Sequence, residues 1–496
     1  MWNLDGRRRP SVVPASPQLT TTEMTSRVPA TDLVRELSRL LPAGHLLHDE
    51  ESLGKYSHDD AEWAPFTAPL AVVLARSTAE VAAVVSYAAD HGIHVVPRGA
   101  GTGLSGGANS VENCLIVSLE LMTSILEIDT VEGLAVAQAG VINDDLRRAV
   151  AEHGLWYPPD PASSKISTIG GNAATNAGGI CCVKYGVTRD YVRGMTVVLA
   201  DGEIVHLGRR TAKGVTGYDL TSLLVGSEGT LGIITDVTVK LLPLAGREEQ
   251  AIIGYFPTLR LAGDAVAAVT AEGIVPAALE LIDSTCLRAV DDWMGLGLPE
   301  DVNVLLMAKI DEPGTTGADL ASRLASIFHD AGGTNIEQAT DPTEIERLFL
   351  ARRMAYPSLE RLGPVLTEDV CVPRHAVPEM LARIQASATE HDVVIANIAH
   401  AGDGNLHPLI IAPVGDDAAK ARAKTAFDRI VDDCRDLGGT VTGEHGVGLL
   451  KLPGAAAELE PRVITMHQQI KNALDPHGIL NPGKAFPAPE PAEELR

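Results

Sequence analysis

Short apolar runs alternate with longer amphipathic segments through the first half of the chain. Aliphatic runs at 69–77, 93–99, 114–120 and 134–140 have the length of buried strands. Residues 78–92 (TAEVAAVVSYAADHG) begin with Thr and Glu, end at Gly and predict a helix between the first two strands. The succession of strand, helix and strand indicates an α/β arrangement.

Two hairpins and a long strand follow from the same patterns. Residues 195–208 place an Asp-Gly pair between apolar runs, which is typical of a tight turn, and residues 231–243 alternate as a long strand does. The pattern changes near residue 246, where a second α/β segment begins, and residues 393–411 (VVIANIAHAGDGNLHPLII) predict another hairpin. Further helices and strands are expected at 31–41, 143–154, 303–310, 344–355, 377–392 and 423–439.

Composition is that of a globular protein and argues against nucleic-acid binding. With 496 residues, 45% apolar and 21% charged, the chain has the length of two or three domains. Aromatic residues make up 4%, too few for a surface that stacks single-stranded bases. The formal net charge is 40 − 65 = −25, which repels a phosphate backbone. A small anionic substrate would therefore need its own buried cation.

The cysteines and the termini bear on location. Six cysteines without a CxxC pair favour a reducing, cytoplasmic compartment, and the lack of a run of about 18 apolar residues predicts no membrane-spanning helix. Residues 1–30 are expected to be a disordered leader without a secretory signal, with Met1 or Met24 as the start. The Pro- and Glu-rich residues 487–496 are expected to be a loose tail.

Three glycine-rich stretches lie beside predicted strands. They are PRGAGTGLSGGA (97–108), PPDPASSKISTIGGNAATNAGG (158–179) and LLVGSEGTLGII (223–234). Consecutive small residues leave backbone N–H groups free to turn toward an anion, although Gly99, Gly101 and Gly103 do not open a long helix as the GxGxxG motif of a Rossmann fold does. Together they suggest one extended dinucleotide lying across a domain.

The order of these stretches resembles the FAD-binding domain of the vanillyl-alcohol-oxidase superfamily. HAGDGNLH (400–407), TGEHGVG (442–448) and DPHGILNPGK (475–484) are similar to the FAD-linked 2-hydroxy-acid dehydrogenases, among them the glycolate oxidase subunit, D-lactate dehydrogenase and D-2-hydroxyglutarate dehydrogenase families. The resemblance extends from about residue 45 to 486.

This resemblance implies an α+β fold of two domains. A PCMH-type FAD-binding domain of two α/β lobes is expected at about 45–245. An α/β substrate or cap domain, the C-terminal domain of the FAD-linked oxidases, is expected at 246–486, with 440–486 returning to the flavin.

The resemblance also implies FAD as the cofactor. Some superfamily members attach the flavin to a His or Cys in or near the first stretch; PRGAGTGLSGG has neither, so noncovalent FAD is expected. Cys181 and Cys182 are interpreted as small buried residues. The residues expected to contact FAD are Pro97, Arg98, Gly99, Ala100, Gly101, Thr102, Gly103, Ser105, Gly106, Pro161, Thr168, Gly171, Asn172, Thr175, Gly178, Gly179, Glu228, Gly229, Ile233 and Asn481.

The second half carries candidate metal ligands and catalytic residues. His400 and His407 flank the expected turn, and their imidazoles suit a divalent ion with Glu444 as third ligand, zinc or manganese by preference and iron as an alternative. His445 is the candidate base, because oxidation of an alcohol needs a base with a pKa near 7. Arg352 stands where the resemblance places the residue that binds the substrate carboxylate, which a guanidinium can hold with two hydrogen bonds.

The sequence thus predicts an FAD-dependent oxidation of a small D-2-hydroxy acid, such as D-lactate or glycolate, to the 2-oxo acid. The metal would bind the substrate hydroxyl, His445 would take its proton, and the C2 hydride would pass to flavin N5. The electron acceptor stays open among oxygen, a quinone, a cytochrome and an electron-transfer flavoprotein. The oligomeric state is also open, with a homodimer as one alternative.

Three alternative functions remain at this point: D-2-hydroxyglutarate dehydrogenase, a noncatalytic flavin-binding partner subunit, and a metal-free oxidase of aromatic alcohols or sugars. A noncatalytic subunit would lack the His pair and the Glu-His pair, and a metal-free oxidase would want more aromatic lining. The D-2-hydroxyglutarate enzymes have Lys and Asn where this chain has Thr367 and Leu409. A second carboxylate would be desolvated there without a partner, unless Arg353 or Arg374 supplies one, so a small or apolar-tailed substrate is favoured.

Overall fold

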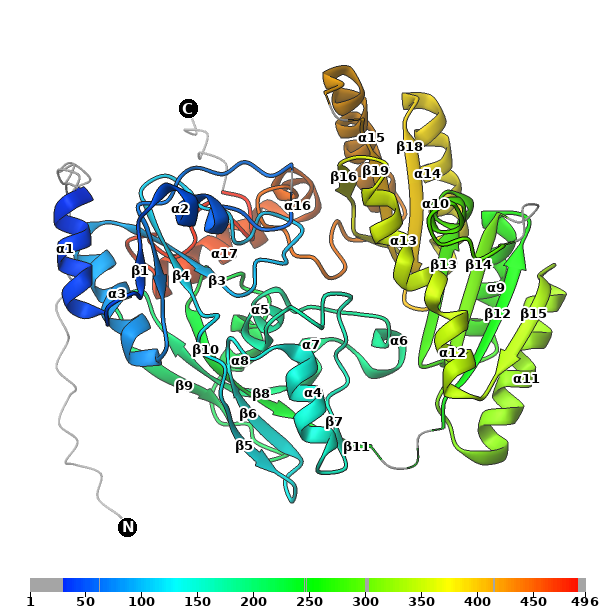
Figure 1. Ribbon diagram of the computed structural model, residues 1–496, viewed down its shortest axis with the longest axis horizontal. Coiled ribbons are helices and arrows are strands. Elements are labelled where there is room, and N and C mark those ends of the chain that lie inside the picture. The colour runs from blue at the N-terminus through cyan, green and yellow to red at the C-terminus, as the bar shows by residue number, and fades with distance from the viewer. Residues whose placement is uncertain are drawn as a thin grey trace, which may run out of the picture.

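The computed structural model describes residues 30–488, apart from 62, 245, 247, 299–302 and 414. Two bodies of helices and strands lie side by side, the first drawn from blue to green and the second from green to brown (Figure 1). The predicted leader, up to residue 29, and residues 489–496 of the predicted tail lie outside the described residues. Within the described part of the chain, no helix is long and apolar enough to cross a membrane.

The first body contains three sheets and the helices that cover them. Its strands are β1 (Leu46–Leu47), β2 (Ala71–Leu74), β3 (His94–Arg98), β4 (Cys114–Ser118), β5 (Ile125–Asp129), β6 (Leu134–Gln138), β7 (Leu155–Trp156), β8 (Val192–Val198), β9 (Ile204–Gly208), β10 (Ile233–Lys240) and β11 (Leu242–Pro243). Its helices are α1 (Ala30–Leu40), α2 (Glu50–Tyr56), α3 (Thr78–His91), α4 (Asn143–Ala151), α5 (Ile169–Thr175), α6 (Cys182–Tyr185), α7 (Thr188–Tyr191) and α8 (Leu220–Leu224).

The sheets of the first body differ in strand direction. In the order β1-β2-β4-β3, the last three strands are parallel, and α3 makes the predicted crossover from β2 to β3. The second sheet, β5-β6-β10-β8-β9, is antiparallel, and β11 pairs with β7. The strand predicted at 231–243 is therefore divided, because the chain leaves the five-stranded sheet after Lys240.

The second body is one antiparallel sheet of eight strands with helices on both faces. Its strands are β12 (Gln250–Phe256), β13 (Ala278–Asp283), β14 (Val304–Ile310), β15 (Thr334–Ala339), β16 (Val365–Thr367), β17 (Val370–Cys371), β18 (Val394–His400) and β19 (Asn405–Ile411). Its helices are α9 (Leu259–Ala271), α10 (Ser284–Met294), α11 (Gly314–Asp330), α12 (Pro342–Leu348), α13 (Leu350–Glu360), a short 3₁₀ turn (Arg374–Ala376), α14 (Val377–His391) and α15 (Asp417–Asp436). The strand order is β15-β12-β14-β13-β18-β19-β16, with β17 also on β19.

Two helix predictions in this body need correction. The helix predicted at 344–355 is two helices, α12 and α13, which meet at the buried Phe349. The helix predicted at 423–439 begins earlier, because the Asp416 carboxylate accepts the Ala419 N–H and caps α15. The hairpin predicted at 393–411 is confirmed as β18 and β19.

Alternation along the strands decides which side chains face which helices. Leu281, Ala399 and Leu406 pack in the apolar core with α9, α11, α14 and α15. Their neighbours Ile282, Ile398 and Leu409 pack in a separate core with α10, α12 and α13. Glu280, His400 and His407 each lie two residues from a member of this second set on the same strand. Because side chains alternate along a strand, all three lie on the face of the sheet that α13 covers.

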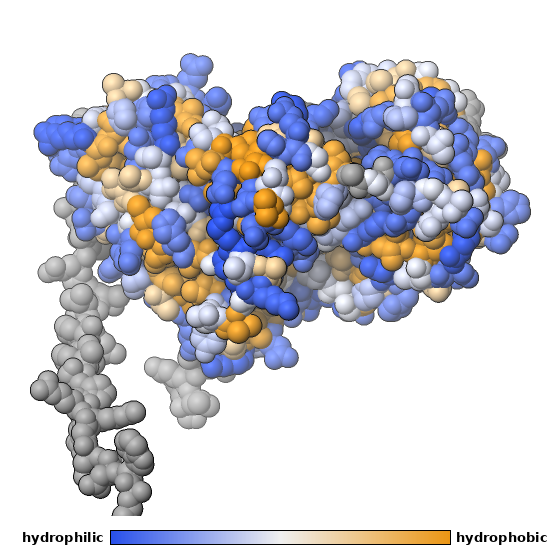
Figure 2. Space-filling model, turned by 90° about the horizontal axis from the view of Figure 1, so that it is seen from below, coloured by the Kyte–Doolittle hydropathy of each residue, from blue (hydrophilic) through white to orange (hydrophobic). Residues whose placement is uncertain are grey.

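The end of the chain returns to the first body. After α16 (Leu452–Glu458), Ile470 and Leu474 of α17 (Pro461–Leu474) pack against the core of the five-stranded sheet. Leu480 forms a parallel bridge with Val95, and the Asn481 side chain donates to the carbonyls of Gly107 and Glu228. Residues from both ends of the chain therefore complete the first body. Figure 2 shows hydrophilic and hydrophobic residues interspersed over the face seen from below.

Candidate active site

A large cavity lies among the three glycine-rich stretches of the first body. It has about 1320 Å³ of empty space, part of it open to solvent. The residues predicted to contact FAD line it, with the exception of Gly106, Gly179 and Asn481. Glu444 and His445, from the far end of the chain, line the same cavity. The structure thus brings the glycine-rich stretches and the TGEHGVG segment around one space.

At some positions of the cavity wall only glycine fits, because a Cβ atom would collide with a neighbouring side chain of the protein. A Cβ on Gly99 would lie 2.5 Å from Thr168 Oγ1. Gly101 has φ of +82°, and a Cβ would lie 2.0 Å from Arg98 Nη2. The wall therefore exposes bare backbone over an extended length, which fits a dinucleotide with a pyrophosphate better than a compact ligand.

Asn481 and Glu228 support the cavity from behind. Asn481 is buried, and its Nδ2 donates to Gly107 O at 2.9 Å and Glu228 O at 2.6 Å. The Glu228 carboxylate accepts the N–H groups of Val447 at 2.8 Å and Gly448 at 2.9 Å. Burial raises the pKa of Glu228 to about 6, although these two N–H groups lower it. Glu228 thus joins the third glycine-rich stretch to the segment that carries Glu444 and His445.

The three predicted metal ligands converge. His400 at the end of β18 and His407 on β19 have ring centroids 5.2 Å apart. Glu444 Oε1 lies 3.3 Å from His400 Nε2 and 3.1 Å from His407 Nε2. A tetrahedral ion held at about 2.1 Å by each ligand separates its ligand atoms by about 3.4 Å. The donor set and its spacing therefore fit a divalent ion of the zinc type.

Electrostatics point to the same conclusion. Burial alone raises the pKa of Glu444, but His400 and His407 bring it well below its ordinary value. Burial lowers the pKa of His400, but Glu280 and Glu444 bring it well above its ordinary value. A buried carboxylate whose ionised form depends on neighbouring imidazoles is an environment that suits a divalent ion.

Asp369, which the sequence did not single out, holds the segment that carries Glu444 and His445. One oxygen, Oδ2, accepts the N–H groups of Gly443, Glu444 and His445 at 3.0, 3.1 and 2.9 Å. The same atom accepts the Thr442 hydroxyl at 2.6 Å. Four donors on one buried carboxylate fix the turn, and with it the direction of both side chains.

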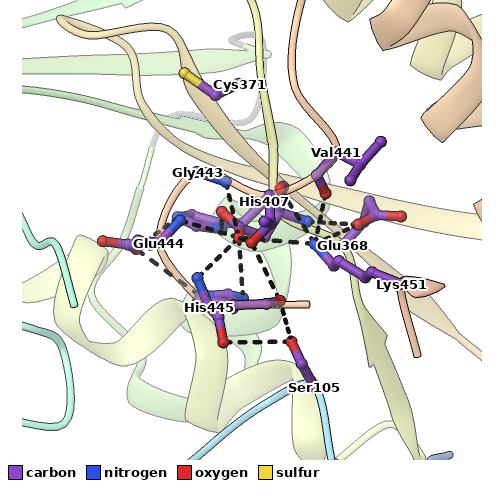
Figure 3. A network of polar contacts seen from close by, with 12 residues as sticks. Ser105, Glu368, Cys371, His407, Val441, Gly443, Glu444, His445 and Lys451 are labelled. Atoms are coloured by element: carbon purple, nitrogen blue, oxygen red, sulfur yellow. Dashed lines mark hydrogen bonds and ion pairs between the residues drawn. The ribbon is translucent and has the colours of Figure 1, made fainter. Parts of the chain in front are cut away.

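A buried ion pair stands behind Asp369. Lys451 Nζ lies 2.7 Å from Glu368 Oε1, and it donates to the carbonyls of Asp369 and Val441 (Figure 3). Lys451 and Glu368 are both buried. The sequence signal for these residues is the Glu-Asp pair directly before a short apolar strand, and the signal for Glu280 is an acid in the interior of the apolar strand ALELID, which ends at Asp283.

His445 lies between the cavity and the metal-ligand cluster. Its ring stacks on His407 with centroids 4.8 Å apart, and its side chain is 15% exposed. Ser105, in the first glycine-rich stretch, donates to Gly446 O at 2.8 Å and holds this loop against the cavity. Burial lowers the pKa of His445 to about 4, against the raising effect of Asp369. The imidazole is therefore neutral at pH 7, but it is a weaker base than the group with a pKa near 7 that the sequence predicts at this position.

Arg352 reaches the cluster from the helix above the sheet. It is 8% exposed, and its Nε donates to Glu280 Oε2 at 2.8 Å. No other described residue offers a hydrogen-bond partner to its two Nη atoms. Arg353, by contrast, pairs with Glu346 near the surface. Of these two arginines, Arg352 belongs to the site.

Comparisons with known proteins identify the family. Residues 69–208 match the model described as "FAD binding domain", and residues 247–485 match "FAD linked oxidases, C-terminal domain". The chain is 39% identical to the glycolate oxidase subunit GlcD of Bacillus subtilis, covering 90% of this chain and 93% of that protein. It is 34% identical to a D-lactate dehydrogenase of Anaerostipes hadrus, covering 91% of this chain and 97% of that protein.

The protein is an FAD-dependent oxidoreductase. The chain belongs to the FAD-linked oxidase family, since it matches both domain models in order and its relatives over nearly their whole length.

Solved structures confirm the predicted PCMH-type fold. A 4-ethylphenol oxidase from Gulosibacter chungangensis superimposes with a TM-score of 0.76, 19% identity and coverage of 93% of this chain and 97% of that one. A p-cresol methylhydroxylase gives 0.74 and 19%, with coverage of 92% and 96%. At this identity the likeness concerns the fold alone.

Proposed function

We propose that the protein oxidises a small D-2-hydroxy acid to the 2-oxo acid, using noncovalent FAD and a divalent ion. One observation carries the proposal: Glu444 and His445 line the same cavity as the glycine-rich stretches. One candidate metal ligand, Glu444, and the candidate base, His445, therefore face the space that fits the flavin. Relatives named as glycolate oxidase subunits and D-lactate dehydrogenases support the substrate class.

Each residue of the site has a role in this proposal. The Nη groups of Arg352 hold the substrate carboxylate, and this orients C2 and its hydroxyl. His445 Nε2 accepts the hydroxyl proton. His400, His407 and Glu444 would hold the ion, whose charge would lower the pKa of that hydroxyl. Bound FAD would supply the hydride acceptor.

The far end of the substrate meets an apolar surface. Thr367 pairs in register with Leu409, and both are buried on the α13 face of the sheet. The Thr367 hydroxyl has no hydrogen-bond partner among the described residues. A second carboxylate placed there would lose its hydration without gaining a cation. This supports glycolate, D-lactate or an alkyl-chain homologue over D-2-hydroxyglutarate.

Flavin bleaching without oxygen tests the proposal. Glycolate, D-lactate, L-lactate and D-2-hydroxyglutarate are mixed with the oxidised protein, and absorbance near 450 nm is followed. Bleaching by the small D-acid or glycolate is expected, followed by recovery when a quinone, a cytochrome or oxygen is added. A kcat/KM for D-2-hydroxyglutarate ten times that of the small acids would contradict the substrate assignment.

Denaturation tests how the flavin is attached. The first stretch contains no His or Cys, and burial raises the pKa of Cys182 far above its ordinary value, which makes it a poor nucleophile. Acid precipitation should therefore release all FAD into the supernatant. Yellow precipitated protein would show a covalent link. All six cysteines are free thiols, in keeping with a cytoplasmic location.

A further inference from the structure

A single carboxylate joins the candidate metal ligands to the candidate substrate anchor. Glu280 is 0% exposed. Its Oε1 lies 2.7 Å from His400 Nδ1, and its Oε2 accepts from Arg352 Nε at 2.8 Å. The two oxygens thus serve two different parts of the site, one each.

The fold makes this sharing direct. Glu280 is the register partner of His400 in the β13–β18 pair, so the two side chains stand next to each other on one face. Arg352 belongs to α13, which packs over β13 on the same face. No rearrangement of the backbone is needed for one carboxylate to reach both.

We propose that Glu280 is a positioning residue that orients His400 toward the metal ion and Arg352 toward the substrate carboxylate at the same time. The proposal rests on the proposed function, because it assigns Glu280 a part in both binding events. A carboxylate at Nδ1 holds the proton on that nitrogen and leaves the Nε2 lone pair directed at Glu444. At Arg352 it fixes the guanidinium through Nε and leaves both Nη groups for an anion.

The second metal-binding histidine lacks an equally close partner. His407 Nδ1 lies 3.7 Å from Asp369 Oδ1, and both atoms are buried without a hydrogen-bond partner among the described residues. Glu280 therefore gives His400 the firmer orientation of the two imidazoles. Among the residues that the structure describes, Glu280 alone pairs with Arg352, so one residue contacts both groups.

The substitution Glu280→Gln distinguishes the proposed positioning role of this carboxylate from a role in packing alone. When the proton is on His400 Nδ1, both neighbours of Glu280 are donors, and the NH₂ group of an amide cannot accept a hydrogen bond from either of them. Glu280→Gln keeps the volume but breaks at least one of the two contacts. Asp283→Asn is the matched control: Asp283 is a buried acid on the same strand that caps α10 and contacts Asn397 instead.

The test measures two bindings on FAD-loaded protein stripped of metal. Zn²⁺ is titrated by calorimetry, and the KM for D-lactate is then measured at saturating Zn²⁺. Glu280→Gln should weaken Zn²⁺ binding roughly 10- to 100-fold, and should still raise KM when the metal is saturating while kcat recovers. Arg352→Met should raise KM alone, His400→Ala should lose Zn²⁺ binding, and Asp283→Asn should change neither.

The outcomes are distinct. Wild-type Zn²⁺ affinity or wild-type KM in Glu280→Gln, with FAD retained, overturns the shared role. Absence of Zn²⁺ binding to the wild-type protein overturns the proposed function as well. If Glu280→Gln does not retain FAD, Glu280→Asp, which withdraws both oxygens by one methylene, is used, and the same double loss is expected.

Discussion

The two bodies of this protein build their parts of the site in opposite ways. The first body makes its cavity from contiguous glycine-rich backbone, where the absence of side chains is the functional feature. The second body makes its cluster from side chains of separate strands and helices, where each buried charge depends on a partner. A side chain added to a glycine should therefore weaken cofactor binding in the first body. Removal of one charged partner should weaken metal and substrate binding in the second.

The largest expected effect comes from His400→Ala. Loss of one of three ligands should abolish the metal site and lower flavin reduction by more than about 10³-fold. FAD content should stay unchanged, because His400 is not part of the cavity wall. Flavin absorbance and anaerobic reduction by D-lactate measure both, with the exposed His329→Ala as control. A chelator should reproduce the loss and a divalent ion reverse it; undiminished activity in His400→Ala would remove the metal from the mechanism.

His445→Ala should act on proton transfer and leave both binding sites intact. The loss of a general base lowers the rate roughly 10²- to 10⁴-fold. Zn²⁺ affinity should match the wild type, because His445 is not a proposed ligand, and FAD should be retained, because the glycine-rich backbone that forms most of the cavity wall is unchanged. Stopped-flow flavin reduction checks the rate, and a near-wild-type value would assign the base to another residue.

Asp369→Asn tests whether the metal site depends on a supporting residue, because it changes none of the three proposed metal ligands. The amide keeps the size of the carboxylate but loses its charge, and Asp369 Oδ2 currently accepts four donors. The turn that carries Glu444 should loosen, and Zn²⁺ should bind roughly 10- to 100-fold more weakly. Calorimetric titration measures the change, with the exposed Asp392→Asn as control. Equal affinities would show that the turn is held by other contacts.

The parts of the site that the sequence predicts also differ between the two bodies. The glycine-rich stretches can be recognised in the sequence because the backbone groups of such a site come from consecutive residues. His400, His407 and Glu444 were singled out because they lie in short motifs. Glu280 and Asp369 were missed, since each acts through partners 120 and about 75 positions away. The divided helix at Phe349 was also missed, because its apolar spacing continues across the break. Local patterns reveal contiguous sites, while pairing across a sheet needs the fold.

The first body also contains a buried charged residue. Lys484 is buried, and its ammonium group donates to the carbonyls of Gly107 and Asn109. Burial lowers its pKa from 10.5 to about 8, despite nearby Asp59 and Glu228. Between these values the unfolded chain binds more protons than the folded protein, so this group makes stability rise with pH. The gain from pH 8 to pH 10 should be about 2 kcal/mol.

Lys484→Met should remove that gain. Urea unfolding of the FAD-loaded wild type and variant at pH 8 and pH 10 gives the difference directly, and comparison of the two proteins cancels the other groups that titrate there. A pH dependence equal in both proteins would show that Lys484 is not buried as a cation.

The smallest expected effect is that of one added methyl group in the cavity wall. Gly101→Ala forces a positive φ on Ala and places Cβ against the Arg98 guanidinium, which can move aside in part. FAD should bind about 10-fold more weakly. Zn²⁺ affinity should be unchanged, and fluorescence titration of apoprotein with FAD measures the difference. Gly54→Ala, in an open position of α2, is the control. A wild-type FAD affinity would show that the wall tolerates side chains.

The return of the chain end to the first body has a consequence for biosynthesis. Leu480 pairs with Val95, and Asn481 and Lys484 hold the carbonyls behind the first glycine-rich stretch. A nascent chain that has emerged only as far as the second body lacks these contacts, so its cofactor cradle is still open. FAD should therefore bind stably only after residues 480–484 have folded onto the first body, and chains that stop before residue 480 should accumulate without colour.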